Sequence, residues 1–295
     1  MAYASFATLL NATETHGTIA AAAAALEAEE TDVSVADIRA RISDTLDVMR
    51  AAIERGSVGD LRSKTGLTGG DAAKILNTTA TPVRPIGGLF ARVIGASVAT
   101  AEVNAAMGRI VAAPTAGASG IVPATIIVLG DEYGLMQDQL VDGLLTAGAI
   151  GGIFAASATL SGAVGGCQAE TGTGAAMAAG AATAMLGGTP AMVGQAASLA
   201  MQGLLGLACD PVAGLVEVPC VMRNATGASV ALAGAEMALA GVEFPIPLDD
   251  VVLAAARIGA SLPLSIRETA RGGLAVTPTG LALTAKVRRF LDGRE

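Results

Sequence analysis

The sequence predicts a mainly α-helical protein, all-α or nearly so, built from closely packed helices rich in alanine and glycine. Hydrophobic residues make up 52% of the chain, whereas aromatic residues make up only 2% and tryptophan is absent. The apolar side chains are therefore mostly small, which allows short distances between helix axes. Strand-like runs are scarce: we note only Ile110–Ala113 and Ile126–Leu129, and the second lies within a helical pattern.

The first 56 residues are predicted to form a helical arm that packs on the rest of the chain. Within 32–55, apolar residues recur every three or four positions, as on one face of an α-helix. These residues are Val35, Ile38, Ile42, Leu46, Met49 and Ile53. Ser34 is the expected N-cap, with Asp37 three positions further on, and Gly56 is the expected end of the helix. The Ala-rich stretch 18–30 is also helical by propensity.

Residues 57–295 consist of apolar helical stretches separated by glycines. A last amphipathic helix is expected over 281–291. It carries Lys286, Arg288 and Arg289 near its C-terminal end, where the helix dipole favours cations. No repeat or low-complexity linker separates the arm from this part, so we expect one structural domain overall.

Two stretches without charged side chains, 143–169 and 171–209, are long enough to cross a membrane. They are interrupted by glycine pairs and Pro190, and they are rich in Ala, Gly, Ser and Thr, which insert less readily than Leu, Ile or Phe. Their flanking charges are acidic, and an aromatic belt is lacking. We therefore expect a buried helical core and no membrane association, with an Ala/Gly-rich membrane or scaffold protein as the alternative.

The charge and the cysteine content favour a cytoplasmic protein that does not bind nucleic acid. The net charge is −8 and the sequence pI is about 4.7, so the overall field repels a phosphate backbone. The first ten residues lack the basic and apolar regions of a signal peptide. Three cysteines are an odd number, which argues against a disulfide framework and for a reducing compartment.

Cys167, Cys209 and Cys220 each have a glycine or proline within two positions, so each is expected at a turn or a helix end. Loop cysteines suit an iron–sulfur cluster, because nearby N–H groups can bond the sulfur atoms. Free cysteines are also common in protein cores, and the separations of 42 and 11 residues match neither zinc ribbons nor ferredoxins. Spacing alone leaves the two interpretations open. Three ligands would leave one metal position open to a substrate.

Glycine-rich loops are expected to form the active site. The loop 114–120, with Thr115, Gly117 and Ser119, precedes a predicted helix and would present amides and hydroxyls to an anion, or would simply start that helix. The loop 65–71, which includes Thr68, has the same character but lacks the spacing of a P-loop. The stretch 268–280 is expected to line the site, since it carries Leu274 and Val276 among few charges.

Neither histidine nor lysine chemistry is favoured. His16, the sole histidine, lies in a polar stretch and is expected to be solvated. A Schiff-base cofactor would need a desolvated lysine. Only Lys74, beside the glycine turn 69–70, is a candidate, so we expect no pyridoxal phosphate.

Five segments resemble the α chain of the iron–sulfur-dependent L-serine dehydratases, also called L-serine ammonia-lyases. They are TGLTGGDAAK (65–74), EVNAAMGRIVAAPTAGASGIVPAT (102–125), SGAVGGCQAETG (161–172), LACDPVAGLVEVPCVMRNATGAS (207–229) and RETARGGLAVTPTG (267–280). The resemblance covers nearly all of the chain beyond residue 30. CDPVAGLVEVPC is specific, because two cysteines stand in fixed register with proline, glycine and glutamate between them.

The resemblance implies that Cys167, Cys209 and Cys220 hold a [4Fe–4S] cluster with one iron not ligated by cysteine, in a catalytic iron–sulfur domain spanning 57–295. It also implies a separate β subunit, in an α/β heteromer that is possibly dimerised. The GPSSSHT-type motif of the family is absent from this chain, so a histidine that assists catalysis would come from the partner. Some members place a C-terminal cysteine on the fourth iron, whereas this chain ends FLDGRE.

The implied reaction deaminates L-serine to pyruvate and ammonia by β-elimination of water, assisted by the open iron as a Lewis acid, within amino-acid catabolism that can feed gluconeogenesis. For substrate binding we expect Thr115, Gly117, Ser119, Thr68 and Arg223. Arg223 would pair with the substrate carboxylate or satisfy carbonyls of the cysteine loops. Glu217 is equally expected as a base or as a structural residue. The alternative substrates are threonine, cysteine or another small hydroxy or thiol amino acid.

Overall fold

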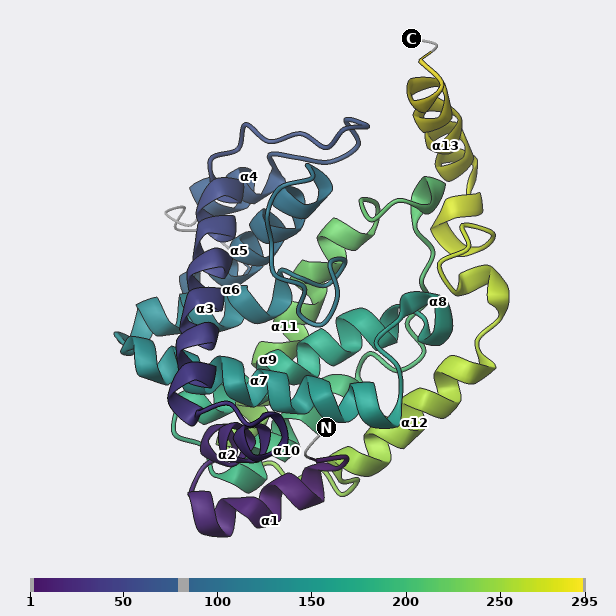
Figure 1. Ribbon diagram of the computed structural model, residues 1–295. Coiled ribbons are helices and arrows are strands. Elements are labelled where there is room, and N and C mark those ends of the chain that lie inside the picture. Colours follow the sequence, from purple (N-terminus) through teal and green to yellow (C-terminus); the bar gives the residue numbers. More distant parts are fainter. Residues whose placement is uncertain (1–2, 79–84, 294–295) are drawn as a thin grey trace.

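The computed structural model describes residues 3–78 and 85–293, and in these ranges helices account for all regular structure (Figure 1). The only ladder pairing there is an isolated parallel bridge between Cys209 and Arg267. The mainly α-helical fold predicted from the small-residue composition is confirmed. The elements, including short 3₁₀ and π turns labelled η, are α1 (Phe6–His16), α2 (Ile19–Thr31), α3 (Val35–Ser57), α4 (Asp71–Asn77), α5 (Gly88–Ala105), α6 (Ile121–Tyr133), α7 (Gln137–Ser157), α8 (Gly162–Gly165), η1 (Gln168–Gly172), α9 (Thr173–Met185), α10 (Pro190–Gln202), η2 (Val212–Gly214), α11 (Cys220–Leu239), α12 (Leu248–Ser261), η3 (Leu264–Ile266), η4 (Gly273–Val276) and α13 (Pro278–Leu291).

The core is centred on α9, which is surrounded by α6, α7, α10 and α11. Almost every residue of α9 is buried, and most are Ala or Gly. A methyl group built on Gly180 would lie 2.2 Å from Cδ1 of Ile150 in α7. The absence of a side chain at such positions lets the helix backbones approach closely, which is how a core with few large residues reaches normal packing density.

The N-terminal arm packs on this core through α3, α2 and α1. Helix α3 begins as expected, because the Ser34 hydroxyl accepts a hydrogen bond from the Asp37 N–H. It continues one residue past the expected end at Gly56, to Ser57. Ile38, Leu46 and Met49 of the predicted face are buried, whereas Val35 at its start is exposed. The boundary at residue 56 between the arm and the rest stays a prediction.

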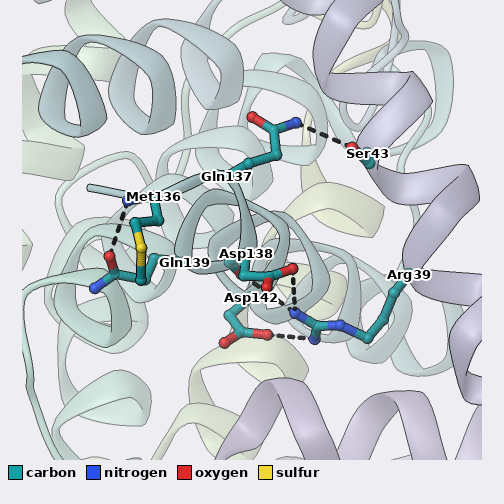
Figure 2. Close-up of polar contacts among 7 residues, drawn as sticks. All are labelled: Arg39, Ser43, Met136, Gln137, Asp138, Gln139 and Asp142. Carbon is teal, nitrogen blue, oxygen red and sulfur yellow. Dashed lines mark hydrogen bonds and ion pairs between the residues drawn. The ribbon is translucent and has the colours of Figure 1, made fainter. Parts of the chain in front are cut away.

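Polar contacts fix α3 against the N-terminal end of α7 (Figure 2). The Arg39 guanidinium pairs with Asp142 at 2.5 Å and with Asp138 at 3.5 Å. The Gln137 amide donates to the Ser43 hydroxyl at 3.1 Å. At the other end of the arm, the N–H groups of Phe6 and Ala7 donate to the Asp249 carboxylate of α12. The arm therefore contacts helices from both the middle and the last thirds of the sequence.

Helix α7 passes a length and composition test for a membrane span, the only helix of the described ranges to do so. Two thirds of its apolar window (67%) is buried inside the fold, where α7 packs on α2, α3 and α9. The core helix of a soluble protein meets the same test, so this observation is weak evidence for a membrane span.

Three local expectations meet different outcomes. Residues 126–129 lie inside α6, as predicted, but 110–113 form no strand, because no neighbouring segment offers a ladder.

The last helix extends three residues further toward the N-terminus than expected, since the Thr277 hydroxyl caps it and Pro278 occupies its first turn. In 268–280, Leu274 and Val276 are exposed by 45% and 44%, so this stretch is partly surface and not a buried lining.

Candidate functional site

Cys167 lies at the start of the π-helical turn η1, which continues into α9. Its side chain is buried, and Sγ lies 3.1 Å from the Thr171 hydroxyl. The neighbouring Gln168 fixes this turn: its amide donates to the Ala255 carbonyl of α12, and its carbonyl accepts from the Gly206 N–H, both at 2.8 Å. Single π turns within α-helices are frequent at functional sites.

Cys209 lies in an extended segment that pairs with residues 266–268. Its N–H donates to the Ile266 carbonyl, and its carbonyl accepts from the Glu268 N–H, both at 2.8 Å. Glu268 and Ala270 have φ values of 62° and 53°, a left-handed conformation that non-glycine residues rarely adopt. Such strained positions persist where the surrounding structure imposes them, and they gather at functional sites.

Cys220 is the first residue of α11, and it is the one cysteine that is partly exposed. The positive end of the helix dipole favours a thiolate at such a position. Cys167 and Cys220 therefore lie at helix starts, as predicted, whereas the prediction of a turn or helix end is wrong for Cys209, because this residue lies in an extended segment that pairs with Arg267.

The three thiols share one electrostatic site. Burial is the largest cause of the raised pKa of each thiol. The charge of Cys167 adds to this effect at both other cysteines, and the pKa of Cys220 reaches about 12. A methyl group built on Gly162 would lie 3.1 Å from Sγ of Cys209 and 2.5 Å from Oε2 of Glu170. Three thiols from separate segments thus lie together with one carboxylate.

Glu170 is the functional candidate that the sequence analysis missed. It accepts a hydrogen bond from the Thr115 hydroxyl at 2.8 Å, and Sγ of Cys209 lies 3.9 Å from its other oxygen. Burial and the charge of Glu268 raise its pKa. Its position three residues after Cys167, in a turn expected at the site, was the available signal.

The glycine-rich loop 114–120 joins the same site. The Asn224 amide of α11 donates to the Gly117 carbonyl, and its oxygen accepts from the Gly120 N–H, both at 2.8 Å. A methyl group on Gly117 would lie 3.4 Å from Oε1 of Glu170. The start of α6 therefore joins the starts of η1 and α11, so three helix N-termini face one region. Ser119 is fully buried, and its hydroxyl has no hydrogen-bond partner in the described structure.

Arg223 is engaged within the protein. One terminal nitrogen donates to the Asp210 carboxylate at 2.7 Å, and the other donates to the Ala208 carbonyl at 2.9 Å. Asp210 also accepts the Leu274 N–H at 2.7 Å. These contacts support the second role considered for Arg223, which is to hold the cysteine loop, over pairing with a substrate carboxylate.

Thr68 and Glu217 form a neighbouring network that belongs to the loop 63–70. The Glu217 carboxylate accepts from the Thr65 hydroxyl at 2.9 Å and from the Thr68 hydroxyl at 3.3 Å. Glu217 is buried three residues before Cys220. Both side chains are thus engaged in tying the loop 63–70 to the turn before α11. His16 ends α1 and is exposed.

The donor set fits a cluster better than a single ion. Among the described residues, no three His, Cys, Asp or Glu side chains are arranged to hold one metal ion. A [4Fe–4S] cluster binds each cysteine at a different iron, so its ligands need not converge on one point. Burial raises the pKa of all three thiols, and the charge of Cys167 raises those of Cys209 and Cys220 further, so three thiolates here would be costly without a compensating cation. Helix N-termini and the Arg223 guanidinium add to the positive surroundings of the sulfurs.

The fold and this site define a helical protein with a buried, three-cysteine polar centre. Residues 14–275 match the family model described as serine dehydratase alpha chain. The chain belongs to this family, as its motifs predict. It is 46% identical over 263 residues to the probable L-serine dehydratase, alpha chain, of Bacillus subtilis (strain 168), covering 89% of this chain and 87% of that one.

Two further relatives differ in length. The L-serine dehydratase, alpha chain, of Peptoniphilus asaccharolyticus is 40% identical over 253 residues, covering 86% of this chain and 85% of that one. The L-serine dehydratase 2 of Escherichia coli (strain K12) is 38% identical over 253 residues, covering 81% of this chain but 54% of that one. The match therefore spans about half the length of this longer relative.

Proposed function

We propose that this chain is the α subunit of an L-serine dehydratase, a carbon–nitrogen lyase that converts L-serine to pyruvate and ammonia. The observation that carries the proposal is the meeting of three cysteines from distant segments at one buried site, in a chain of the serine dehydratase α-chain family. Water leaves the substrate first, and hydrolysis of the resulting imine then releases ammonia. The reaction needs no net redox change and uses no pyridoxal phosphate.

Cys167, Cys209 and Cys220 are the proposed ligands of a [4Fe–4S] cluster with one iron free of cysteine. When bound, such a cluster supplies a Lewis acid that assists departure of the substrate hydroxyl group. The protein holds the three thiols through separate devices: the buried Gln168 amide for the first, the paired segment 266–268 for the second, and the start of α11 for the third.

The substrate carboxylate and ammonium groups are proposed to bind between the loop 114–120 and Glu170. Amide groups of Thr115, Gly117 and Ser119 lie at the positive end of α6, which favours a carboxylate. The Glu170 carboxylate, held by the Thr115 hydroxyl, is suited to the ammonium group. Thr68 and Arg223 act indirectly in this proposal, by holding the loops that carry Glu217 and Cys209.

A separate β chain is proposed as the partner, since two relatives are named alpha chains and this chain matches only 54% of the longer Escherichia coli relative. The described residues near the thiols include no histidine, so a histidine that takes part in proton transfer would come from that partner. We place the complex in the cytoplasm, because three free cysteines at a cluster site require reducing surroundings. Its product pyruvate can enter gluconeogenesis.

The test is Cys209→Ser in protein purified without oxygen and combined with the β chain. We expect loss of the brown cluster absorbance and of pyruvate formation from L-serine, because a hydroxyl is a poor iron ligand. Thr183→Ser is the control: it is an equally small change at a buried position in α9, outside the site. Full activity and iron content in the cysteine variant would refute the cluster assignment.

The same preparation separates the alternative substrates. Initial rates with L-serine, L-threonine and L-cysteine at equal concentrations give the order of kcat/KM. We expect L-serine to be preferred. A higher kcat/KM for another amino acid would mean that the proposed reaction is retained but that this amino acid is the preferred substrate.

A further inference from the structure

Exposed apolar side chains occur close in sequence to Cys167 and Cys220 and next to the segment that pairs with Cys209. Val164 precedes Cys167 by three residues and is 54% exposed. Met222 follows Cys220 by two residues and is 44% exposed. Leu264 begins the turn that leads into the segment paired with Cys209 and is 57% exposed. The Arg267 guanidinium donates to the Val164 carbonyl, and the Arg267 N–H donates to the Leu264 carbonyl, so the segments of Val164 and Leu264 are neighbours beside the cysteine site.

Exposed apolar residues continue onto the C-terminal helix. Leu274, Val276 and Leu281 are also exposed, and they lie on η4 and at the start of α13. Helix α13 projects at one edge of the molecule, where it packs on η2 and η4 (Figure 1). Of its residues only Gly280 and Val287 are buried. The Leu274 N–H and the Arg223 guanidinium both bind Asp210, so η4 lies beside the residue that follows Met222. Exposed apolar residues on neighbouring segments are typical of an interaction site.

The charge of this region is opposite to that of the whole chain. Residues 262–293 carry five cationic side chains against two anionic ones, whereas the net charge of the full sequence is −8. The cations are Arg267, Arg271, Lys286, Arg288 and Arg289. A partner that covers this surface is therefore expected to combine apolar side chains with an acidic rim.

We propose that the rim face, defined as Val164, Met222, Leu264, Leu274, Val276 and Leu281, is the docking surface for a separate β chain. This inference rests on the proposed function, and it assigns the partner's place at the same site. The β chain covers the partly exposed Cys220 and thereby closes the cysteine site from bulk water. The occupant is a chain resembling the part of the longer relative that this chain does not match.

A second copy of this chain fits the rim face less well. In a two-fold symmetric contact the same surface meets itself, so the cationic side chains of α13 and of 267–271 would face their own counterparts. Like charges across an interface cost free energy. The proposed partner instead brings opposite charge, and its association is expected to weaken as salt concentration rises.

The test measures the affinity of the anaerobic, iron-loaded α chain for the purified β chain by titration calorimetry. Leu281→Glu and Met222→Glu are each expected to weaken binding at least tenfold. Met136→Glu, the same change as in Met222 but at the opposite end of α7 from the site, is expected to bind like the unaltered chain, although Met136 is 71% exposed. Iron and sulfide contents should stay unchanged in Leu281→Glu, which is remote in sequence from the cysteines.

Two results would overturn the docking surface. One is unchanged affinity in both rim variants. The other is a loss of self-association of the α chain in Leu281→Glu, seen by light scattering, with β-chain binding intact. The proposed function is judged separately: absence of iron, or of pyruvate formation at saturating β chain, would refute it even where β-chain binding depends on Leu281.

Discussion

At the scale of single residues, Glu102 is a buried carboxylate of α5. It is 1% exposed, and one oxygen accepts the Asp71 N–H at 2.7 Å at the start of α4. The other oxygen has no hydrogen-bond partner in the described structure. Burial raises its pKa above the ordinary value for glutamate, although backbone N–H groups of α4 oppose this shift.

This shift predicts a pH-dependent effect of Glu102→Gln on stability. The folded protein holds the Glu102 proton more tightly than the unfolded chain, so its contribution to stability falls as pH rises above the ordinary glutamate pKa. Glutamine cannot ionise and lacks this loss. We expect the free energy of unfolding of the variant, relative to the unaltered protein, to increase between pH 4 and pH 7 in urea titrations.

Glu14→Gln, on the exposed face of α1, is the control and should show no such trend. If the free energy of unfolding of Glu102→Gln differs from that of the unaltered protein by a constant amount across this pH range, the pKa of Glu102 is not raised in the folded protein.

The cysteines could be predicted as site residues because they are rare and each has a glycine or proline within two positions. The only signal for Glu170 was its position three residues after Cys167, and Asn224 had none, since its role depends on partners far along the chain. Asn224 acts through the loop 114–120, about a hundred residues earlier. Arg223 was identified as important, but its partner Asp210 could be found only from the folded structure.

At the scale of elements, close helix approach depends on glycines that face another backbone. Gly56 of α3 lies against α5, where an added methyl group would come within 2.1 Å of the Ala99 carbonyl oxygen, so the distance leaves no room for it. Gly148 of α7 is also within a helix, but no atom lies within 4 Å of its added methyl group. Alanine substitutions at these two positions therefore distinguish the cost of crowding between two helices from the gain in helix propensity.

Gly56→Ala is expected to destabilise the protein by about 1–3 kcal/mol or more, because a backbone must move. Gly148→Ala, the matched control, should stabilise it by about 0.5–1 kcal/mol through helix propensity. Urea unfolding at one pH measures both. Equal effects of the two substitutions would show that α3 and α5 do not approach as described.

Helices with a clear apolar period and a capping residue were predictable, as α3 with Ser34 shows. The stretch 268–280 was not, because its apolar residues suggested burial while the fold leaves Leu274 and Val276 at the surface. A sequence does not distinguish an apolar residue that packs within its own chain from one exposed in the free subunit.

At the scale of the whole molecule, the composition predicted tightly packed small-residue helices, and that expectation is met around α9. The meeting of the starts of α6, η1 and α11 was not predictable, because it depends on how the helices are arranged. A cluster bound there would connect η1, the segment around Cys209 and α11, and would stabilise the folded state by binding it and not the unfolded chain.

We therefore expect anaerobically loaded protein to melt at a higher temperature than the cluster-free form, by roughly 5 °C or more. Differential scanning calorimetry under nitrogen gives this difference. Cys209→Ser should reduce it strongly, whereas Thr183→Ser should retain it. Identical melting temperatures of the loaded and cluster-free forms would argue against a ligand shared by these elements.

The pairing of Cys209 with residues 266–268 bears on how the protein is made. All three cysteines and the whole of α11 are synthesised before that pairing segment leaves the ribosome. A growing chain therefore displays its thiols before the backbone around the middle one is fixed. Iron delivery to the proposed cluster would therefore be best timed after translation ends, and a polypeptide cut short after α11 would retain all three cysteine sulfur atoms while lacking the segment that orients one of them.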